Sequence, residues 1–223
     1  MIHIVFQNEN FVVCDKPASV LSVPSRDRHD PRGCLGIALQ HQLKQSVLPV
    51  HRLDFEVSGL ILFALNKKAH RISQDWFEKR SISKMYTAVT SLQDFSHWPE
   101  AIPTVRDKID LQLQKNFLWK TKIQRGKRRS FESPHGEWSE TRAQIEKVDG
   151  SKVSWNLFPL TGKPHQLRLE LSRRGFPIHG DSLYGSKVKL ASTAGIALQA
   201  VGLDLNHVSD RLGLPSIIRL TNV

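Results

Sequence analysis

Hydrophobic and polar positions form two short β-rich segments at the start of the chain. Residues 2–6 and 11–15 are rich in β-branched and aromatic side chains, and the polar tetrapeptide Gln-Asn-Glu-Asn separates them. This pattern predicts a β-hairpin. Apolar residues at positions 35, 38, 39 and 43 recur at helical spacing, and the apolar run 60–65 predicts a central strand buried on both faces.

A second helix is predicted after this strand, because apolar residues at 69, 72, 76 and 77 recur behind Asn66, a good N-cap residue. Further strands are expected at 86–89, 142–148, 152–160 and 196–203, with Asp149-Gly150 as a hairpin turn. The last predicted helix runs from about 164 to 174 with Thr161 as its cap.

The remaining segments lack a regular pattern. Residues 24–32 are polar and predict a long exposed loop, and residues 93–140 read as irregular. The elements together predict one domain spanning residues 1–223, of the α/β (α+β) class. It should contain a single mixed, mainly antiparallel sheet flanked by helices.

The charge of the chain favours a polyanionic partner. Thirty-two Lys and Arg face 21 Asp and Glu, which gives a net charge of +11, and a hydrophobic content of 39% supports a sizeable core. Neither a membrane span nor a signal peptide is recognisable, so we expect a cytoplasmic protein with RNA as its partner. Cys14 and Cys34 have no ligand spacing and should be reduced thiols, and no metal site is expected.

A cluster of basic residues without acidic neighbours lies between positions 120 and 129. Such a run is often only a solvated face, but Trp119 and Phe131 flank it, and aromatic side chains beside cations favour RNA contact. We therefore assign RNA binding to the basic residues of this run. They are Lys120, Lys122, Arg125, Lys127, Arg128 and Arg129.

One carboxylate stands at a position suited to catalysis. Asp54 follows His51-Arg52-Leu53 and precedes Ser58-Gly59 and the predicted buried strand, which places it on a loop at the edge of the core. Taken alone, an Asp beside an Arg is more often a surface ion pair. The fragment also approaches the kinase catalytic loop, but the glycine-rich loop and Asp-Phe-Gly of a kinase are missing.

Several further segments carry a resemblance. They are Asp-Lys-Pro-Ala (15–18), HRLDFEVSGL (51–60), Lys-Met-Tyr-Thr-Ala (84–88), TGKPHQLRLEL (161–171) and PIHGDSLYG (177–185). In this order they closely resemble the motifs of RluA-type RNA pseudouridine synthases, and they cover most of the chain. The resemblance implies the catalytic fold of that family, without cofactor and here without an appended S4-like domain.

The resemblance also implies roles for individual residues. Asp54 acts on the ribose of the target uridine while the bond from C1′ to N1 breaks, either by attack at C1′ or by removal of the 2′ hydrogen. Tyr86 stacks on the uracil, Arg168 pairs with Asp54, and Arg52 helps to hold the flipped-out nucleotide. From the residues alone, Arg168 could equally be a solvated helix charge. RNA-binding roles are also assigned to His51, Lys163 and His165.

These residue types suit an isomerisation. Glycoside hydrolysis uses two carboxylates, one of which activates water, whereas an isomerase that keeps its detached base needs no water. Burial would raise the pKa of Asp54, and a close arginine would lower it by about 1 to 3 units, keeping the carboxylate charged.

Four positions depart from the family pattern and put target choice in doubt. They are Val57 for Thr, Lys163 for Arg, Glu170 for His and Gln199 for His. The leading hypothesis is a synthase that isomerises uridines of structured rRNA or tRNA, acting as a monomer. The alternatives are a catalytically silent RNA-binding or chaperone protein on the same fold, and a metal-dependent RNA hydrolase, which lacks HExxH or a comparable spacing.

Overall fold

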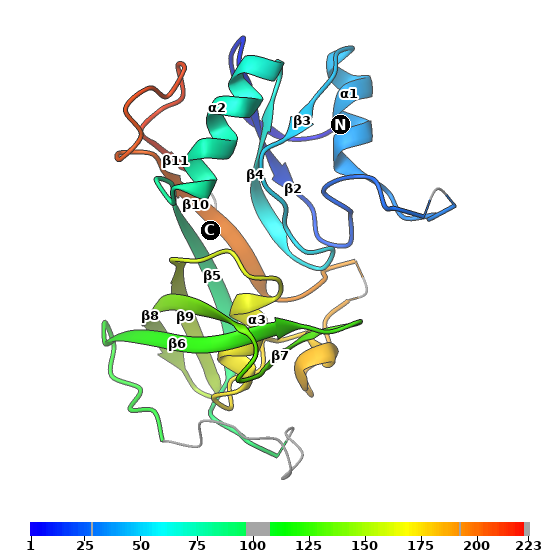
Figure 1. Ribbon diagram of the computed structural model, residues 1–223. Coiled ribbons are helices and arrows are strands. Elements are labelled where there is room, and N and C mark those ends of the chain that lie inside the picture. The colour runs from blue at the N-terminus through cyan, green and yellow to red at the C-terminus, as the bar shows by residue number, and fades with distance from the viewer. Residues whose placement is uncertain (28, 97–107, 192, 221–223) are drawn as a thin grey trace. The chain divides into compact units, whose positions relative to one another are not determined.

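Strands make up most of the regular secondary structure in the described residues, which we take from a computed structural model. The structure describes residues 1–27, 29–96, 108–191 and 193–220. These residues divide into two units, each with its own packing (Figure 1). Unit 1 contains residues 1–84, 193–195 and 199–220, and unit 2 contains residues 85–191 and 196–198. The expectation of a single domain remains a prediction beside this division.

Unit 1 is built around the predicted hairpin and the predicted buried strand. Its strands are β1 (Ile4–Gln7), β2 (Phe11–Lys16), β3 (Leu48–Pro49), β4 (Ser58–Ala64), β10 (Leu198–Asp204) and β11 (Ile217–Arg219). They pair in the order β1-β2-β4-β10, with β3 on β4 and β11 on β10. β4 and β10 run parallel, whereas the other pairs are antiparallel, so the sheet is mixed as predicted.

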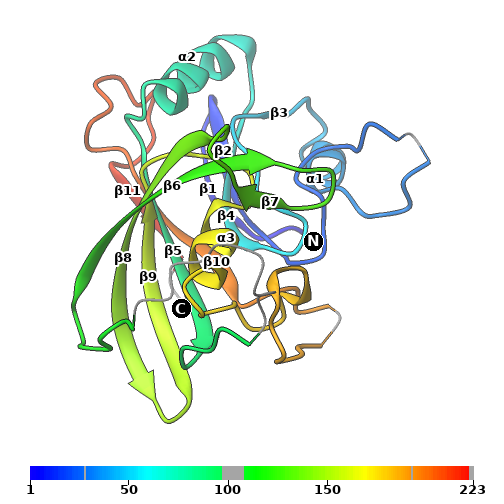
Figure 2. The same cartoon turned by 60° about the horizontal axis from the view of Figure 1, so that its bottom comes forward.

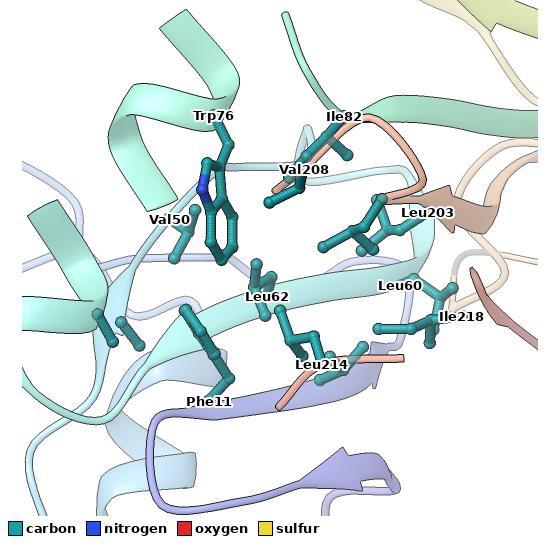
Figure 3. Packing of buried hydrophobic residues seen from close by; sticks show 14 residues of the cluster. Phe11, Val50, Leu60, Leu62, Trp76, Ile82, Leu203, Val208, Leu214 and Ile218 are labelled. Atoms are coloured by element: carbon teal, nitrogen blue, oxygen red, sulfur yellow. The ribbon is translucent and has the colours of Figure 1, made fainter. Parts of the chain in front are cut away.

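Two helices complete unit 1. Helix α1 (Leu35–Leu43) and helix α2 (Lys67–Glu78) match the predicted helices, and the Asn66 side chain caps α2 by accepting from the N–H of Ala69 at 2.8 Å. Trp76 of α2 packs beside Phe11 and Leu62 in a cluster that also receives residues from β10 and β11 (Figure 3). This core supports the strand that follows the Asp54 loop.

The strands of unit 2 pair with one another antiparallel, and one α-helix packs against them. Its elements are β5 (Ser83–Ser91), β6 (Asn116–Arg125), β7 (Ser130–Glu132), β8 (Glu137–Asp149), β9 (Lys152–Pro159), α3 (Gln166–Ser172) and a 3-10 helix, η1 (Ser182–Tyr184). The strand order is β5-β9-β8-β6-β7. Helix α3 packs on β6, β7 and β9 (Figure 2). The turn between β8 and β9 lies at Asp149-Gly150, as predicted, with Gly150 at a φ of 56°.

Three predictions about unit 2 were wrong. Residues 116–125 and 130–132, expected to be irregular, form β6 and β7, while residues 97–107 of that stretch lie outside the described residues. Trp119, expected to flank an RNA-binding run, is buried, because it alternates inward with Thr121 and Ile123 along β6. Helix α3 is preceded by His165 in the left-handed region, and Thr161 instead contacts the Gln166 side chain at 2.8 Å.

Other expectations are confirmed or answered directly. Residues 24–27 and 29–32 are largely exposed and lie in a loop, and both cysteines are free thiols, with Cys14 buried and Cys34 of intermediate exposure. Burial, with a smaller contribution from the charge of Asp15, raises the pKa of Cys14 to about 12. Among the described residues, none of the helices is long and apolar enough to cross a membrane.

Candidate active site

The Asp54 loop is anchored on both sides by backbone contacts within unit 1. Ser22 Oγ accepts from the N–H of Leu53 at 3.0 Å and donates to the carbonyl of the same residue at 2.9 Å. On the other side, the N–H of Val57 donates to the carbonyl of Asp54 at 3.2 Å. Leu53 and Val57 are both buried, whereas Asp54 is only partly buried. The loop therefore places the carboxylate at the edge of the core, as the sequence predicts.

Lys16, from the Asp-Lys-Pro-Ala segment, supports the same loop from inside. Its ammonium is fully buried and donates to the carbonyls of Val20, Pro17 and Phe55 at 2.8, 3.0 and 3.3 Å. Burial lowers the pKa of Lys16 to about 8, and the negative charge of Asp54, followed by that of Glu56, partly opposes this shift. The buried ammonium of Lys16 thus lies close enough to Asp54 and Glu56 for their charges to interact with it.

His51 has a role that the sequence did not suggest. The N–H of Leu62 donates to His51 Nε2 at 3.1 Å, and the ring stacks on Phe77 with a centroid distance of 4.9 Å. Burial, with a smaller effect of the Lys84 charge, lowers the pKa of His51 to about 3. A neutral ring between β4 and α2 fixes the chain ahead of Asp54, whereas the neighbouring Arg52 is exposed and accessible to a ligand.

Tyr86 lies on β5 in unit 2 and is half-buried. It is paired with Leu157 of β9, so its ring is on the same face of the sheet as Leu157. The paired strand fixes the position of the Tyr86 backbone, and a partly exposed ring at such a position suits stacking on a base.

Arg168 is held by a carboxylate within its own unit. Its Nε and Nη2 donate to the two oxygens of Asp181 at 2.7 and 2.8 Å, and both side chains are only 1% exposed. The guanidinium also lies 5.3 Å from the ring centre of Tyr184. Arg168 is therefore not a solvated helix charge, and Asp181 fixes the plane of its guanidinium.

A hydrogen-bonded chain links two predicted RNA-binding residues to Tyr184. Arg125 Nη1 donates to His165 Nε2 at 3.1 Å, and His165 Nδ1 lies 3.2 Å from the Tyr184 hydroxyl. Because Nε2 accepts, a neutral His165 carries its proton on Nδ1 and donates to the hydroxyl. That hydroxyl accepts from the N–H of Ser130 at 2.8 Å and donates to its carbonyl.

The basic residues of the 120–129 run divide between β6 and the turn after it. Lys120 pairs with Glu140 at 3.0 Å, and Lys122 is partly buried, while the side chains of Lys127 and Arg128 in the turn are exposed. Lys163, outside the run, pairs with Glu137. The run thus divides into strand residues, among them Lys120 with its ion pair, and exposed cations in the turn.

Glu170, one of the four departures from the family pattern, is a buried structural group. Its carboxylate pairs with Arg174 and accepts from the Ser139 hydroxyl at 3.1 Å, and the Arg174 guanidinium covers the ring of Trp119 at 4.4 Å. A charge at this position is accommodated because a cation accompanies it. Val57, another departure, is an apolar core residue.

The three predicted catalytic residues are distributed over both units. Asp54 belongs to unit 1, and Tyr86 and Arg168 belong to unit 2. Their action on one nucleotide remains a prediction. Sequence reasoning missed Lys16, Asp181 and Tyr184 as supporting residues, although all three lie within the motifs that carried the resemblance.

Comparison with known proteins identifies the family. A family model described as RNA pseudouridylate synthase matches residues 10–173. The chain belongs to the RNA pseudouridylate synthase family. Among its relatives in this family is a protein named dual-specificity RNA pseudouridine synthase RluA from Vibrio vulnificus, which is 30% identical over 92% of this chain and 77% of the relative. The protein of the same name from Escherichia coli is 30% identical over 92% of this chain and 86% of its own length.

Solved structures support the fold of this pseudouridine synthase family. Human RNA Pseudouridylate Synthase Domain Containing 1 matches with a TM-score of 0.68 and 22% identity, covering 99% of this chain and 82% of that one. The corresponding human Domain Containing 4 protein gives a TM-score of 0.65 at 21% identity, covering 91% and 84%. The predicted fold class, a mixed and mainly antiparallel α/β fold with few helices, is confirmed. Within the described residues, no three His, Cys, Asp or Glu side chains group as metal ligands.

Proposed function

We propose that this chain converts specific uridines of a structured RNA to pseudouridine, with Asp54 as the essential carboxylate. Membership of the family supports the reaction class, and the anchoring of the loop by Ser22 and Lys16 supports the choice of carboxylate. The net charge of +11 matches a polyanionic substrate. Relatives named dual-specificity RNA pseudouridine synthases support an RNA substrate, and we propose rRNA or tRNA as its class.

The reaction breaks the bond from C1′ to N1 and forms a bond from C1′ to C5 of the same uracil. The proton leaves C5, N1 gains a proton, and no water or cofactor is consumed. Attack at C1′ and removal of the 2′ hydrogen both need Asp54 in its ionised form. The buried ammonium of Lys16 interacts electrostatically with the charge of Asp54.

We further propose that Tyr86 and Arg168 act on the same uridine as Asp54. Extrusion of a base from a folded RNA costs a few kcal/mol, and stacking on an aromatic ring returns about 1 to 3 kcal/mol. Tyr86 would supply that stacking. Arg168, with its orientation set by Asp181, would stabilise the carboxylate of Asp54. We expect a monomer that works in the cytoplasm.

The substitution Asp54→Asn tests the catalytic assignment. It should abolish pseudouridine formation, measured by nucleoside mass spectrometry, and leave RNA affinity within a few fold, because Asn keeps the shape but not the charge. Asp75→Asn, at an exposed helix position paired with Lys79, is the matched control and should stay active. Equal activity in Asp54→Asn would overturn the assignment and favour the silent RNA-binding alternative.

The RNA-binding assignment of the basic turn is tested by the salt dependence of affinity. Neutralising Lys127, Arg128 and Arg129 should weaken binding and reduce the slope of log K against log salt by roughly 0.7 per lost phosphate contact. A control that neutralises three exposed cations of α2 should leave the slope unchanged. These are Lys67, Lys68 and Arg71. Equal slopes in both variants would mean that the turn is only a solvated surface and does not contact RNA.

The substrate itself is identified by mapping pseudouridines in total RNA from cells with and without the gene. A uridine modified only when the gene is present defines the target. An unchanged map would contradict the proposed activity.

A further inference from the structure

One face of the unit 2 sheet is exposed and carries aromatic and basic side chains together. Along β6, Trp119, Thr121 and Ile123 point inward, so the residues between them point outward. The strand register places Lys122 opposite Trp138, Leu118 opposite Arg142, and Gln124 opposite Phe131. We call this surface the Trp138 face. It consists of Leu118, Lys120, Lys122, Phe131, Trp138, Glu140 and Arg142.

The apolar content of the Trp138 face is unusual for a solvated sheet surface. Trp138 is 59% exposed, Leu118 54% and Phe131 41%. Trp138 and Phe131 are the aromatic residues among the large hydrophobic side chains that the described part of the chain exposes. Aromatic rings gathered on one exposed face mark an interaction site more often than scattered apolar residues do.

The charges of the Trp138 face indicate the sign of the partner. Lys120, Lys122 and Arg142 are opposed on this face by Glu140, which pairs with Lys120. Lys122 lies over the Trp138 ring, with its ammonium 5.4 Å from the ring centre. The exposed cations of the turn at 127–128 directly follow β6. A partner that meets these groups must carry negative charge beside flat apolar groups.

We propose that the Trp138 face binds a single-stranded segment of RNA, with an unpaired base stacked on Trp138 and phosphates beside Lys122 and Arg142. An unpaired strand offers both phosphates and exposed base faces, whereas a duplex keeps its bases stacked on one another and offers mainly backbone. Interleaved cations and aromatic rings are the usual composition of surfaces that bind unpaired strands. The inference rests on the proposed function only in taking RNA as the partner.

Fluorescence anisotropy with a labelled oligouridylate of roughly 12 nucleotides tests the stacking step. Trp138→Ala should weaken binding by about 5- to 140-fold, the range that corresponds to the loss of one stacked base. Trp138→Phe should recover most of the affinity, because it restores a ring. Trp138→Leu should bind as weakly as Trp138→Ala, since it keeps apolar bulk without an aromatic face. Leu113→Ala, at an equally exposed residue outside the Trp138 face, should bind like the parent chain.

A second arm tests the phosphate contacts and the preference for single strands. Arg142→Gln should reduce the salt slope for the oligouridylate by roughly 0.7. An RNA duplex of the same length should lose much less affinity than the oligouridylate on Trp138→Ala. Equal binding by Trp138→Leu and Leu113→Ala, or equal losses for duplex and single strand, would overturn the proposal and point to a protein partner for this face.

The binding readout is separate from catalysis. A chain that binds oligouridylate through Trp138 but forms no pseudouridine would refute the proposed function and leave this inference standing. If the chain forms pseudouridine and Trp138→Leu binds oligouridylate with unaltered affinity, the proposed function stands and this inference is refuted.

Discussion

The substitution Asp181→Asn tests whether the Arg168 guanidinium depends on Asp181 for its orientation, because it leaves Arg168 itself unchanged. In the structure, Asp181 accepts from two nitrogens of Arg168, and neither side chain is more than 1% exposed. Asn has nearly the same shape, but it removes the charge and presents an amide N–H to a guanidinium that can only donate. The buried cation then loses a bidentate partner while Arg168 itself is unchanged.

The expected magnitude follows from the burial. Breaking a buried ion pair by removing one partner costs about 3 to 5 kcal/mol, and the polar Asn should place this case near about 3 kcal/mol. For a chain of this size, that corresponds to a fall in Tm of about 6 to 12 °C. Asp149→Asn is the matched control, because Asp149 pairs with Lys147 at 2.9 Å on the surface of the same unit. It should lower Tm by less than about 4 °C.

Calorimetry and pseudouridine formation together test this reasoning. At a temperature at which both variants are folded, Asp181→Asn should lower kcat at least about tenfold, since each 1.4 kcal/mol of lost transition-state stabilisation lowers the rate tenfold. Asp149→Asn should keep the parent rate. If Asp181→Asn matched the control in both Tm and kcat, the bidentate pair with Asp181 would not be what positions Arg168.

Three further predictions concern unit 1. Gly59→Ala should give an insoluble or strongly destabilised chain in a thermal assay, because Gly59 has a φ of 111° and a Cβ there would lie 2.2 Å from a backbone oxygen of β10. Gly33→Ala should be tolerated in the same assay, since a Cβ there would have nothing within 4 Å. A thiol reagent at pH 8 should label Cys34 in the native chain and Cys14 only after unfolding, since burial raises the pKa of Cys14 to about 12. Rapid labelling of both cysteines in the native chain would contradict the burial of Cys14. Because the pKa of His51 is about 3 in the folded chain, the free energy of unfolding should fall as pH drops from about 6.5 towards 3, where only the unfolded ring binds a proton. In urea titrations His51→Gln should lack this loss of stability, and the same pH slope in both chains would refute the prediction.

Local patterns in the sequence were enough to predict many elements of the fold. The cap at Asn66, the turn at Asp149-Gly150 and the buried strand β4 depend on neighbouring residues, so a window of the sequence contains the information. Strand β6 was missed because its cations were read as a charge run. The alternation of Lys120 and Lys122 with inward apolar residues was present in the same letters.

The support of the candidate site was harder to predict, because it depends on pairs that are distant in the chain. Ser22 and Leu53 are 31 residues apart, and Arg168 and Asp181 are 13 apart. Helix α3 begins after His165, which is in the αL conformation, and not at the predicted position near residue 164. His165 hydrogen-bonds to Arg125 and Tyr184 of other elements, which the local sequence does not reveal. The motif residues could be named from the sequence, but the partners that orient them could not.

The parallel pairing of β4 with β10 has a consequence for how the polypeptide acquires its shape during synthesis. Ser58 is paired with Gln199, so strand β4 of unit 1 gains this partner only when a segment more than half a chain later has been translated. The unit 2 strands β5, β9, β8, β6 and β7 pair with one another without such a late segment. Pairings of long sequence separation form slowly, and the N-terminal strands therefore pass through a period on the ribosome with an unsatisfied edge. A chain truncated after residue 191 should accordingly resist protease in the strands of unit 2 and be cleaved in the strands of unit 1.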